Sequence, residues 1–243
     1  MSPSILFFSL LGGVLPALLW LWFWLKEDRL HPEPRAFIMG SFIAGMLAVF
    51  FALPLEQWIC NRATPNALTG CQDALGNSTS VLFVIIGWAI VEETLKYSAA
   101  YLSALRGREN DEPIDSLIYL ITAALGFAAL ENTLFLVGAF NQGGVVHVVD
   151  LGVLRFVGAT LLHIVTSGAL GFFLALGFNR HRHIKRLNLL LGLSAAILLH
   201  TFFNIYILKV AGAGNTTLSV FAFVWLAITL LLIGFEKVKQ LRA

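Results

Sequence analysis

The residues of this sequence that could do chemistry stand inside long apolar stretches. Residues 91–96 read Val-Glu-Glu-Thr-Leu-Lys within an apolar stretch of about 80–104. On a helix, Lys96 follows Glu93 by three residues and Glu92 by four, so its ammonium can pair with either carboxylate. Adjacent residues point about 100° apart, so one carboxylate can face a cavity while a neighbouring helix holds the other. A buried ion-pair network that fixes helix register is the alternative.

Three later stretches carry polar groups of a similar kind. Glu131 follows a run of small residues over 123–129, which lets another helix approach closely. His163 stands alone in its stretch, whereas His200 and Asn204 share one helix face. Each feature alone also fits a packing contact. The candidate catalytic residues are Glu92, Glu93, Glu131, His163, His200 and Asn204, with Lys96, Phe127 and Asn132 in supporting positions.

The composition indicates the environment in which these residues lie. Hydrophobic residues make up 58% of the 243 residues and charged residues 12%, with a mean hydropathy of +0.82. A soluble domain carries about 25% charged residues, so a soluble enzyme, a disordered regulator and a coiled coil are excluded. The net charge of +2 gives no sign of nucleic-acid binding. We predict an all-α, polytopic transmembrane bundle that forms one integral membrane domain over residues 1–243.

Seven stretches are long enough to cross a membrane, which takes roughly 20 apolar residues. They cover about 4–25, 35–56, 80–104, 114–140, 151–178, 187–209 and 217–235. Twelve Lys and Arg side chains lie in the first, third and fifth connections and the C-terminal tail, against two in the other connections. Because basic loops stay in the cytoplasm, we predict an outside N-terminus and a cytoplasmic C-terminus, in a bacterial inner or plasma membrane.

The two cysteines lie in a connection that this orientation places outside. Cys60 and Cys71 share one polar segment, and an oxidising compartment favours a disulfide between them. Free thiols in a reducing setting are the alternative. In both cases we expect the pair to have a structural role in an exposed loop and none in the chemistry.

Burying these charges is costly, and their depth suggests a shared use. Each charge near mid-bilayer costs about 2.5–3.5 kcal/mol, so three glutamates and one lysine cost on the order of 10 kcal/mol, as much as a domain's net stability. At about 1.5 Å per residue, Glu92 lies roughly 15–18 Å below the outer surface. His163 then lies near the midplane, and Glu131 and His200 lie in the outer half. The four helices within about 80–209 therefore bring the residues to one level.

Such a cluster suits the attack of water on an amide inside a membrane cavity. A glutamate can take a proton from water and return it as a general base, and an imidazole beside it can orient the water or share the proton. His200 and Asn204 could hold the carbonyl oxygen as charge develops on it.

In this order, the residues resemble the PrsW family of intramembrane proteases, part of a wider superfamily of CAAX prenyl proteases and bacteriocin-processing enzymes. The resemblance covers roughly residues 88–205. It rests on an EExxK motif at 92–96, on Glu112-Pro113-Ile114-Asp115 leading into 126–132, on His163, and on HxxxN at 200–204.

The resemblance implies hydrolysis of a membrane-anchored protein. The family's substrates include single-span anti-sigma factors, cut on the extracytoplasmic side as the first step of a stress-signalling cascade. By motif, Glu92 resembles the general base and Glu93 its partner. His163 resembles a catalytic histidine, and His200 with Asn204 the oxyanion donors. The expected partners are a single-span membrane substrate and the lipid bilayer, with no nucleic acid.

Two departures from the wider superfamily bear on the mechanism. Phe127 leads to Glu131, whereas the superfamily has FxxxH, so the partner of Glu92 stays open. Ser116 and Leu120 replace expected glycines.

The sequence also leaves the metal open. Two glutamates and two histidines could bind zinc, but the chain has no HExxH motif, and Asn204 would be an unusual ligand. We expect metal-free, glutamate-dependent hydrolysis without a cofactor. If zinc is bound, the expected ligands are Glu92, Glu131, His163 and His200.

Two other classes of function fit the same residues. A proton- or ion-coupled transporter could use Glu92, Glu131 and the histidines as a relay, although no inverted repeat is visible. A non-catalytic scaffold could grip a partner's transmembrane helix, which the small residues Gly40, Ala44 and Ala48 would serve.

Overall fold

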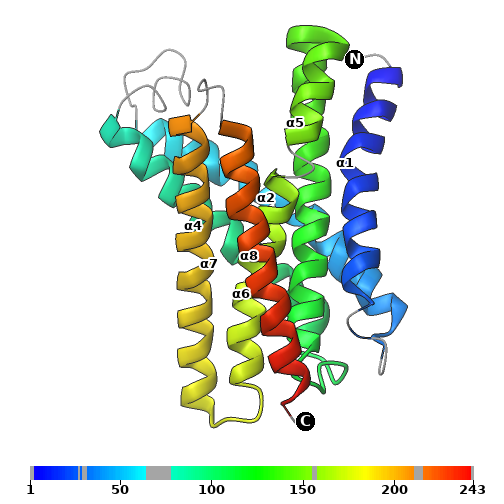
Figure 1. The fold of residues 1–243 in the computed structure, drawn as a ribbon, viewed down its shortest axis with the longest axis vertical. Helices are drawn as coiled ribbons and strands as arrows, with labels where there is room; N and C mark the ends of the chain where they lie inside the picture. Colours follow the sequence, from blue (N-terminus) through cyan, green and yellow to red (C-terminus); the bar gives the residue numbers. More distant parts are fainter. Residues whose placement is uncertain are drawn as a thin grey trace.

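The chain folds into a bundle of long helices. The computed structural model describes residues 3–26, 28, 32–63, 78–154, 158–210 and 216–241. Within these ranges there is no strand, and the α-helices are α1 (Pro3–Trp24), α2 (Arg35–Ala63), α4 (Ser78–Ala100), α5 (Asp115–Leu154), α6 (Thr160–Leu176), α7 (Arg182–Val210) and α8 (Thr216–Lys239). A single π-helical turn, η1 (Tyr101–Leu105), continues α4. Most helices run along the long axis of the molecule (Figure 1).

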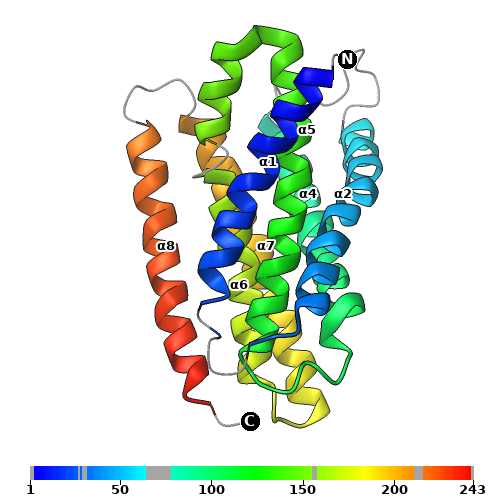
Figure 2. The ribbon, with the colours of Figure 1, turned by 90° about the vertical axis from the view of Figure 1, so that its right-hand side faces the viewer.

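The helices confirm the predicted all-α membrane bundle. Within the residues that the structure describes, four segments are long and apolar enough to cross a membrane, namely Pro3–Trp24, Arg35–Ala63, Asp115–Phe140 and Arg182–Ile207. The chain is therefore a multi-pass membrane protein. Its first helix begins at one end of the bundle and its last ends at the other (Figures 1 and 2). The number of spans and their sidedness stay predictions.

The fifth predicted stretch, 151–178, is wrong at its start. Residues 151–154 belong to α5, which runs to Leu154, and α6 begins only at Thr160. In Figure 2 the α5 ribbon turns over at the top of the bundle and runs back toward the start of α6. The sequence is mostly apolar both before and after this turn, so hydropathy alone does not show where α5 ends and α6 begins.

Helix α5 is the core of the bundle, and it touches α2 backbone to backbone. Every residue from 113 to 129 is buried, and α5 packs against α1, α2, α4 and α6. A Cβ atom on Gly126 would lie 1.9 Å from the carbonyl oxygen of Phe42, and one on Gly45 would lie 1.9 Å from that of Ala123. The small residues on α5 thus allow the close approach that the sequence predicts.

Helix α2 continues beyond the predicted end of the second span. Pro54 stands inside it, and the helix runs on to Ala63. Cys60, near its end, is disulfide-bonded, whereas Cys71 lies outside the described residues. Glu56, the last residue of the predicted span, thus lies inside the helix and is part of the site described below.

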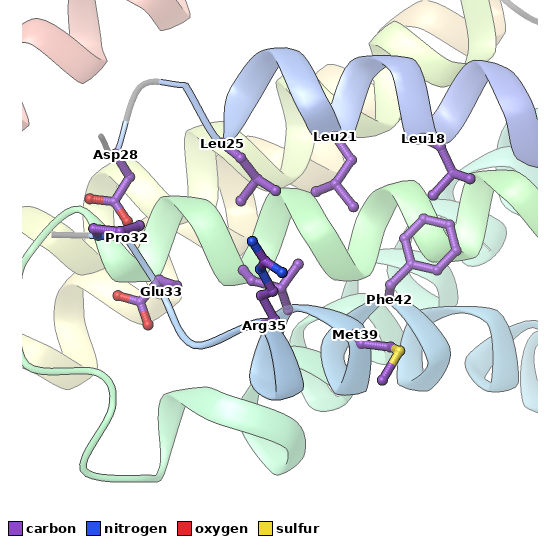
Figure 3. Close-up of a pocket in the computed structure, with 10 residues that line it drawn as sticks. Leu18, Leu21, Leu25, Asp28, Pro32, Glu33, Arg35, Met39 and Phe42 are labelled. Carbon is purple, nitrogen blue, oxygen red and sulfur yellow. The ribbon is translucent and has the colours of Figure 1, made fainter. Parts of the chain in front are cut away.

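A pocket of about 340 Å³ opens between the start of α2 and the end of α1 (Figure 3). Its walls are mostly aliphatic, and charged residues stand at one end. Figure 3 shows Asp28, Glu33 and Arg35 near the connection between the two helices. Tyr119 of α5 donates a hydrogen bond to the Glu33 carboxylate, and Asp115 is a further hydrogen-bonding neighbour of Glu33. This cluster ties the α1–α2 connection to the start of α5.

The Glu33 cluster predicts a pH-dependent stability. Burial, followed by the neighbouring Asp115 carboxyl, raises the pKa of Glu33 from 4.5 to about 8. The folded state therefore holds a proton that the unfolded chain releases, so the stabilisation is complete below pH 4.5 and is lost as the pH rises through about 8. We expect the thermal unfolding midpoint in detergent to fall across this window. The Glu33→Gln variant should show a smaller fall than wild type, and Glu109→Gln should show the full fall; equal profiles for all three proteins would contradict the assignment.

Candidate active site

Four helices bring the predicted charged residues together in the interior of the bundle. Helix α4 supplies Glu92, Glu93 and Lys96, α5 supplies Glu131, α6 supplies His163, and α7 supplies His200. The two imidazole rings lie with centroids 5.6 Å apart, edge to face. The glutamates and histidines that the sequence predicts at a similar depth in the membrane thus contact one another in the structure.

Glu93 is the most enclosed of the carboxylates, and it orients His200. Its Oε1 accepts hydrogen bonds from Lys96 Nζ at 2.8 Å, Thr166 Oγ1 at 3.1 Å and His200 Nδ1 at 2.7 Å. Since Nδ1 of His200 donates to Glu93, neutral His200 presents the lone pair of Nε2. That nitrogen lies 3.9 Å from Glu92 Oε1.

His163 is held in a similar way from the opposite side. Lys96 Nζ lies 2.6 Å from its Nδ1, and because an ammonium only donates, Nδ1 accepts. The proton of neutral His163 is therefore on Nε2, which donates to Glu131 Oε2 at 3.0 Å. Phe127 packs beside both groups, with its ring centroid 5.7 Å from that of His163 and 4.9 Å from Lys96 Nζ.

Glu92 lies between the two histidines. Its oxygens are each 3.9 Å from an imidazole nitrogen, and Lys96 Nζ is 3.4 Å from Oε2. That oxygen is buried and, within the described ranges, forms no hydrogen bond beyond this ion-pair contact. Glu92 therefore has bonding capacity that the protein side chains do not fill.

These contacts form a group of possible metal ligands. Glu92, His163 and His200 each offer a ligand atom, and the three atoms lie within 4.8 Å of one another. One carboxylate and two imidazoles form a common ligand set of catalytic zinc sites. In this geometry Glu131 is not part of the group, although the sequence suggests it as a fourth ligand, because it contacts His163 on the side away from Glu92.

The remaining predicted residues occupy positions around the cluster. Asn132 is buried and donates to Thr160 Oγ1 at 3.0 Å, which joins α5 to α6. Asn204 lies one turn beyond His200 on α7 and is partly exposed. Within the part of the chain that the structure describes, no hydrogen bond joins Asn204 to the cluster, so its role stays a prediction.

Sequence reasoning missed two residues of this neighbourhood. Glu56 on α2 interacts electrostatically with Glu92 and Glu131, and its backbone carbonyl accepts a hydrogen bond from Trp88 Nε1 at 3.2 Å. Glu56 is the last residue of the predicted second span of about 35–56, so counting it with the other acids inside the spans could have indicated it. Thr166, the donor to Glu93, is spaced one helical turn from His163, and this spacing could have indicated it.

Comparison with known proteins finds relatives of this chain. A sequence model of the family described as "PrsW family intramembrane metalloprotease" matches residues 33–233. The protein named Protease PrsW from Geobacillus kaustophilus is 29% identical over 136 residues, which is 53% of this chain and 52% of the relative. Its namesake from Bacillus subtilis is 26% identical over 163 residues, or 67% of this chain and 66% of the relative.

A third Protease PrsW, from Halalkalibacterium halodurans, is 24% identical over 206 residues, or 83% of this chain and 84% of the relative. The chain thus spans about half to two-thirds of the first two relatives and most of the third. No solved structure matches the chain significantly.

Proposed function

Because the chain belongs to the PrsW family of intramembrane metalloproteases, we propose that it is an intramembrane endopeptidase that hydrolyses a peptide bond of a membrane-anchored protein. The observation that carries the proposal is the cluster of Glu92, His163 and His200, three potential metal ligands within 4.8 Å of one another in the interior of the bundle. The proposed substrate class is the single-span, anti-sigma-factor-like protein, cut on its extracytoplasmic side.

The residues of the cluster fit the divalent metal that the family description implies. Glu92 Oε2 is a buried acceptor without a hydrogen-bond donor within the described residues. Three glutamates against one lysine also leave the cluster with an excess of negative charge, even before Glu56 is counted. Because unneutralised buried charge is costly, a cation is favoured there. We propose that Glu92, His163 and His200 hold the metal, with zinc as the first candidate.

The second sphere around these ligands is also present. Glu93 accepts from His200 and Glu131 accepts from His163, and such carboxylate–imidazole pairs fix the ring orientation of metal-binding histidines. Lys96 offsets the charge of Glu93 at 2.8 Å. Its ammonium now donates to Nδ1 of His163 at 2.6 Å, so in the proposal it leaves that nitrogen when His163 binds the metal. In the proposal, Glu93 and Lys96 position His200 and do not contact the substrate.

Glu131 is the proposed proton acceptor for the attacking water. If Glu92 is a ligand, another carboxylate must take that proton, and Glu93 already accepts three hydrogen bonds. The Glu131 side chain is 20% exposed, against 8% for Glu92 and 0% for Glu93, so water reaches it most readily. A bound zinc ion would supply Lewis acidity toward the carbonyl oxygen. Asn204, one turn from His200, is the proposed hydrogen-bond donor to that oxygen.

A cleavage assay with metal analysis tests the proposal. The wild-type protein in liposomes is incubated with a panel of single-span substrates, with and without a chelator, and its metal content is measured separately. We expect cleavage by wild type that stops on chelation and returns when zinc is added. His200→Ala should lose both the metal and the cleavage, because it removes a ligand.

His181→Ala is the matched control, since His181 is an exposed histidine in the connection before α7. It should behave as wild type. Undiminished cleavage by His200→Ala, or by chelated protein shown to be metal-free, would contradict the metal site. If the protein binds a partner's transmembrane helix without a metal and without cleaving it, the non-catalytic scaffold would be favoured.

A further inference from the structure

A second pocket, whose lining includes none of the cluster residues, lies where α4 with η1, α5, α6 and α7 converge. Its volume is about 410 Å³. Arg182 and Lys185 line it at the start of α7, eighteen and fifteen residues before His200. At about 1.5 Å per residue, this places the two cations roughly 22–27 Å from His200 along α7. The connection from α6 to α7 lies at the bottom of the bundle in Figure 1, the end predicted to face the cytoplasm.

Three cations gather on one side of this pocket. Arg182, Lys185 and Arg186 all line it, and their spacing of three and four residues places them on one helix face. The first turn of α7 holds no acidic residue, and within the described residues these three side chains form no ion pair. Cations at a helix N-terminus repel one another and the positive end of the helix dipole. An anion in the pocket would relieve both repulsions.

The other walls of the pocket are suited to the membrane boundary. Tyr97 and Tyr101 line it, with ring centroids 5.8 Å apart, and tyrosines favour the level of lipid headgroups. Tyr101 begins the π-helical turn η1, and such turns occur frequently at functional sites. Leucines at 105, 174 and 189 form an apolar wall, and the lining also includes Asn110, Ser116, Gly177 and Phe178. The pocket therefore joins a cationic side, two phenol hydroxyls and an apolar wall.

We propose that this pocket binds an anionic phospholipid, whose phosphate lies among Arg182, Lys185 and Arg186 and whose acyl chains follow the leucine wall. Charge complementarity argues for this occupant, since basic pockets between membrane helices bind anionic headgroups. The apolar wall favours a lipid over a free phosphate ion, and the position at the helix ends brings the site to headgroup depth. The proposal is independent of the proteolytic function.

The test compares lipids and matched charge-removal variants. Wild type is placed in nanodiscs of phosphatidylcholine alone or with phosphatidylglycerol, and thermal unfolding is followed. We expect phosphatidylglycerol to raise the unfolding midpoint of wild type by about 5 °C, less at high salt. The triple variant Arg182→Gln/Lys185→Gln/Arg186→Gln should lose this increment. In native mass spectrometry it should also lose the retained phosphatidylglycerol that wild type carries.

The control variant Arg106→Gln/Arg108→Gln/Lys237→Gln removes three cations at the same predicted side without altering the residues that line the pocket. It should keep the full increment and the retained lipid. Equal losses in both triple variants would mean general surface attraction and would overturn the proposal. It would also be overturned if the pocket variant kept the increment, or if inorganic phosphate gave wild type the same increment in phosphatidylcholine.

Discussion

Replacing Glu92 with glutamine is expected to remove the metal and to lower the rate of substrate cleavage by about 1000-fold or more. The carboxamide is nearly the same size as the carboxylate but carries no charge, and its nitrogen is no ligand. Glu92 lies 3.9 Å from an imidazole nitrogen on each side, so the change reaches the centre of the proposed ligand group. Because the volume hardly changes, the thermal unfolding midpoint of the apo protein should stay within a few degrees of wild type.

The corresponding change at Glu131 separates the two proposed roles. Glu131→Gln should retain the metal, since Glu131 contacts His163 only from the outer side at 3.0 Å, and should lose about 100- to 10,000-fold in rate as a missing general base. Glu236→Gln, at an exposed ion pair with Lys239, should leave both quantities unchanged. If Glu131→Gln loses the metal while Glu92→Gln keeps it, Glu131 is the metal ligand and Glu92 the proton acceptor. Full activity in both variants would exclude the proposed mechanism.

Replacing Gly126 with alanine is expected to disrupt the folded bundle, although it adds only one methyl group. The new Cβ would lie 1.9 Å from the Phe42 carbonyl oxygen, which belongs to the backbone of α2 and cannot rotate away. The two helices must separate, and this costs about 3 kcal/mol or more, at the upper end for overpacking. We expect a lower thermal midpoint and aggregated material on size exclusion in detergent.

Gly138→Ala is the matched control for this change. It adds the same methyl group to the same helix, at a position where a Cβ would meet nothing within 4 Å. Its midpoint should equal that of wild type or exceed it slightly, since alanine favours helix. If the two variants unfold at the same temperature, the contact between α2 and α5 is not as close as the structure shows.

The class of the protein and most of its candidate site could be predicted from the sequence. Long apolar stretches interrupted by few charges specify membrane helices, because the bilayer penalises each exposed charge and each unpaired backbone group. The same penalty makes Glu92, Glu93 and Lys96 conspicuous, since a buried charge needs a partner. The spacing within one helix also predicted that Lys96 reaches both glutamates, and it does, at 3.4 and 2.8 Å.

Only the tertiary structure decided which groups meet across helices. Helical periodicity gives the face of each residue within its own helix, but it does not give the rotation of one helix against another. Backbone contacts such as that of Gly126 with Phe42 set part of this rotation. The separation of Glu131 from the ligand group, the pairing of His200 with Glu93 and the arrival of Glu56 beside Glu92 all depend on it. Composition and spacing therefore determined a charged site inside a membrane bundle, and packing between helices determined the place of each group within it.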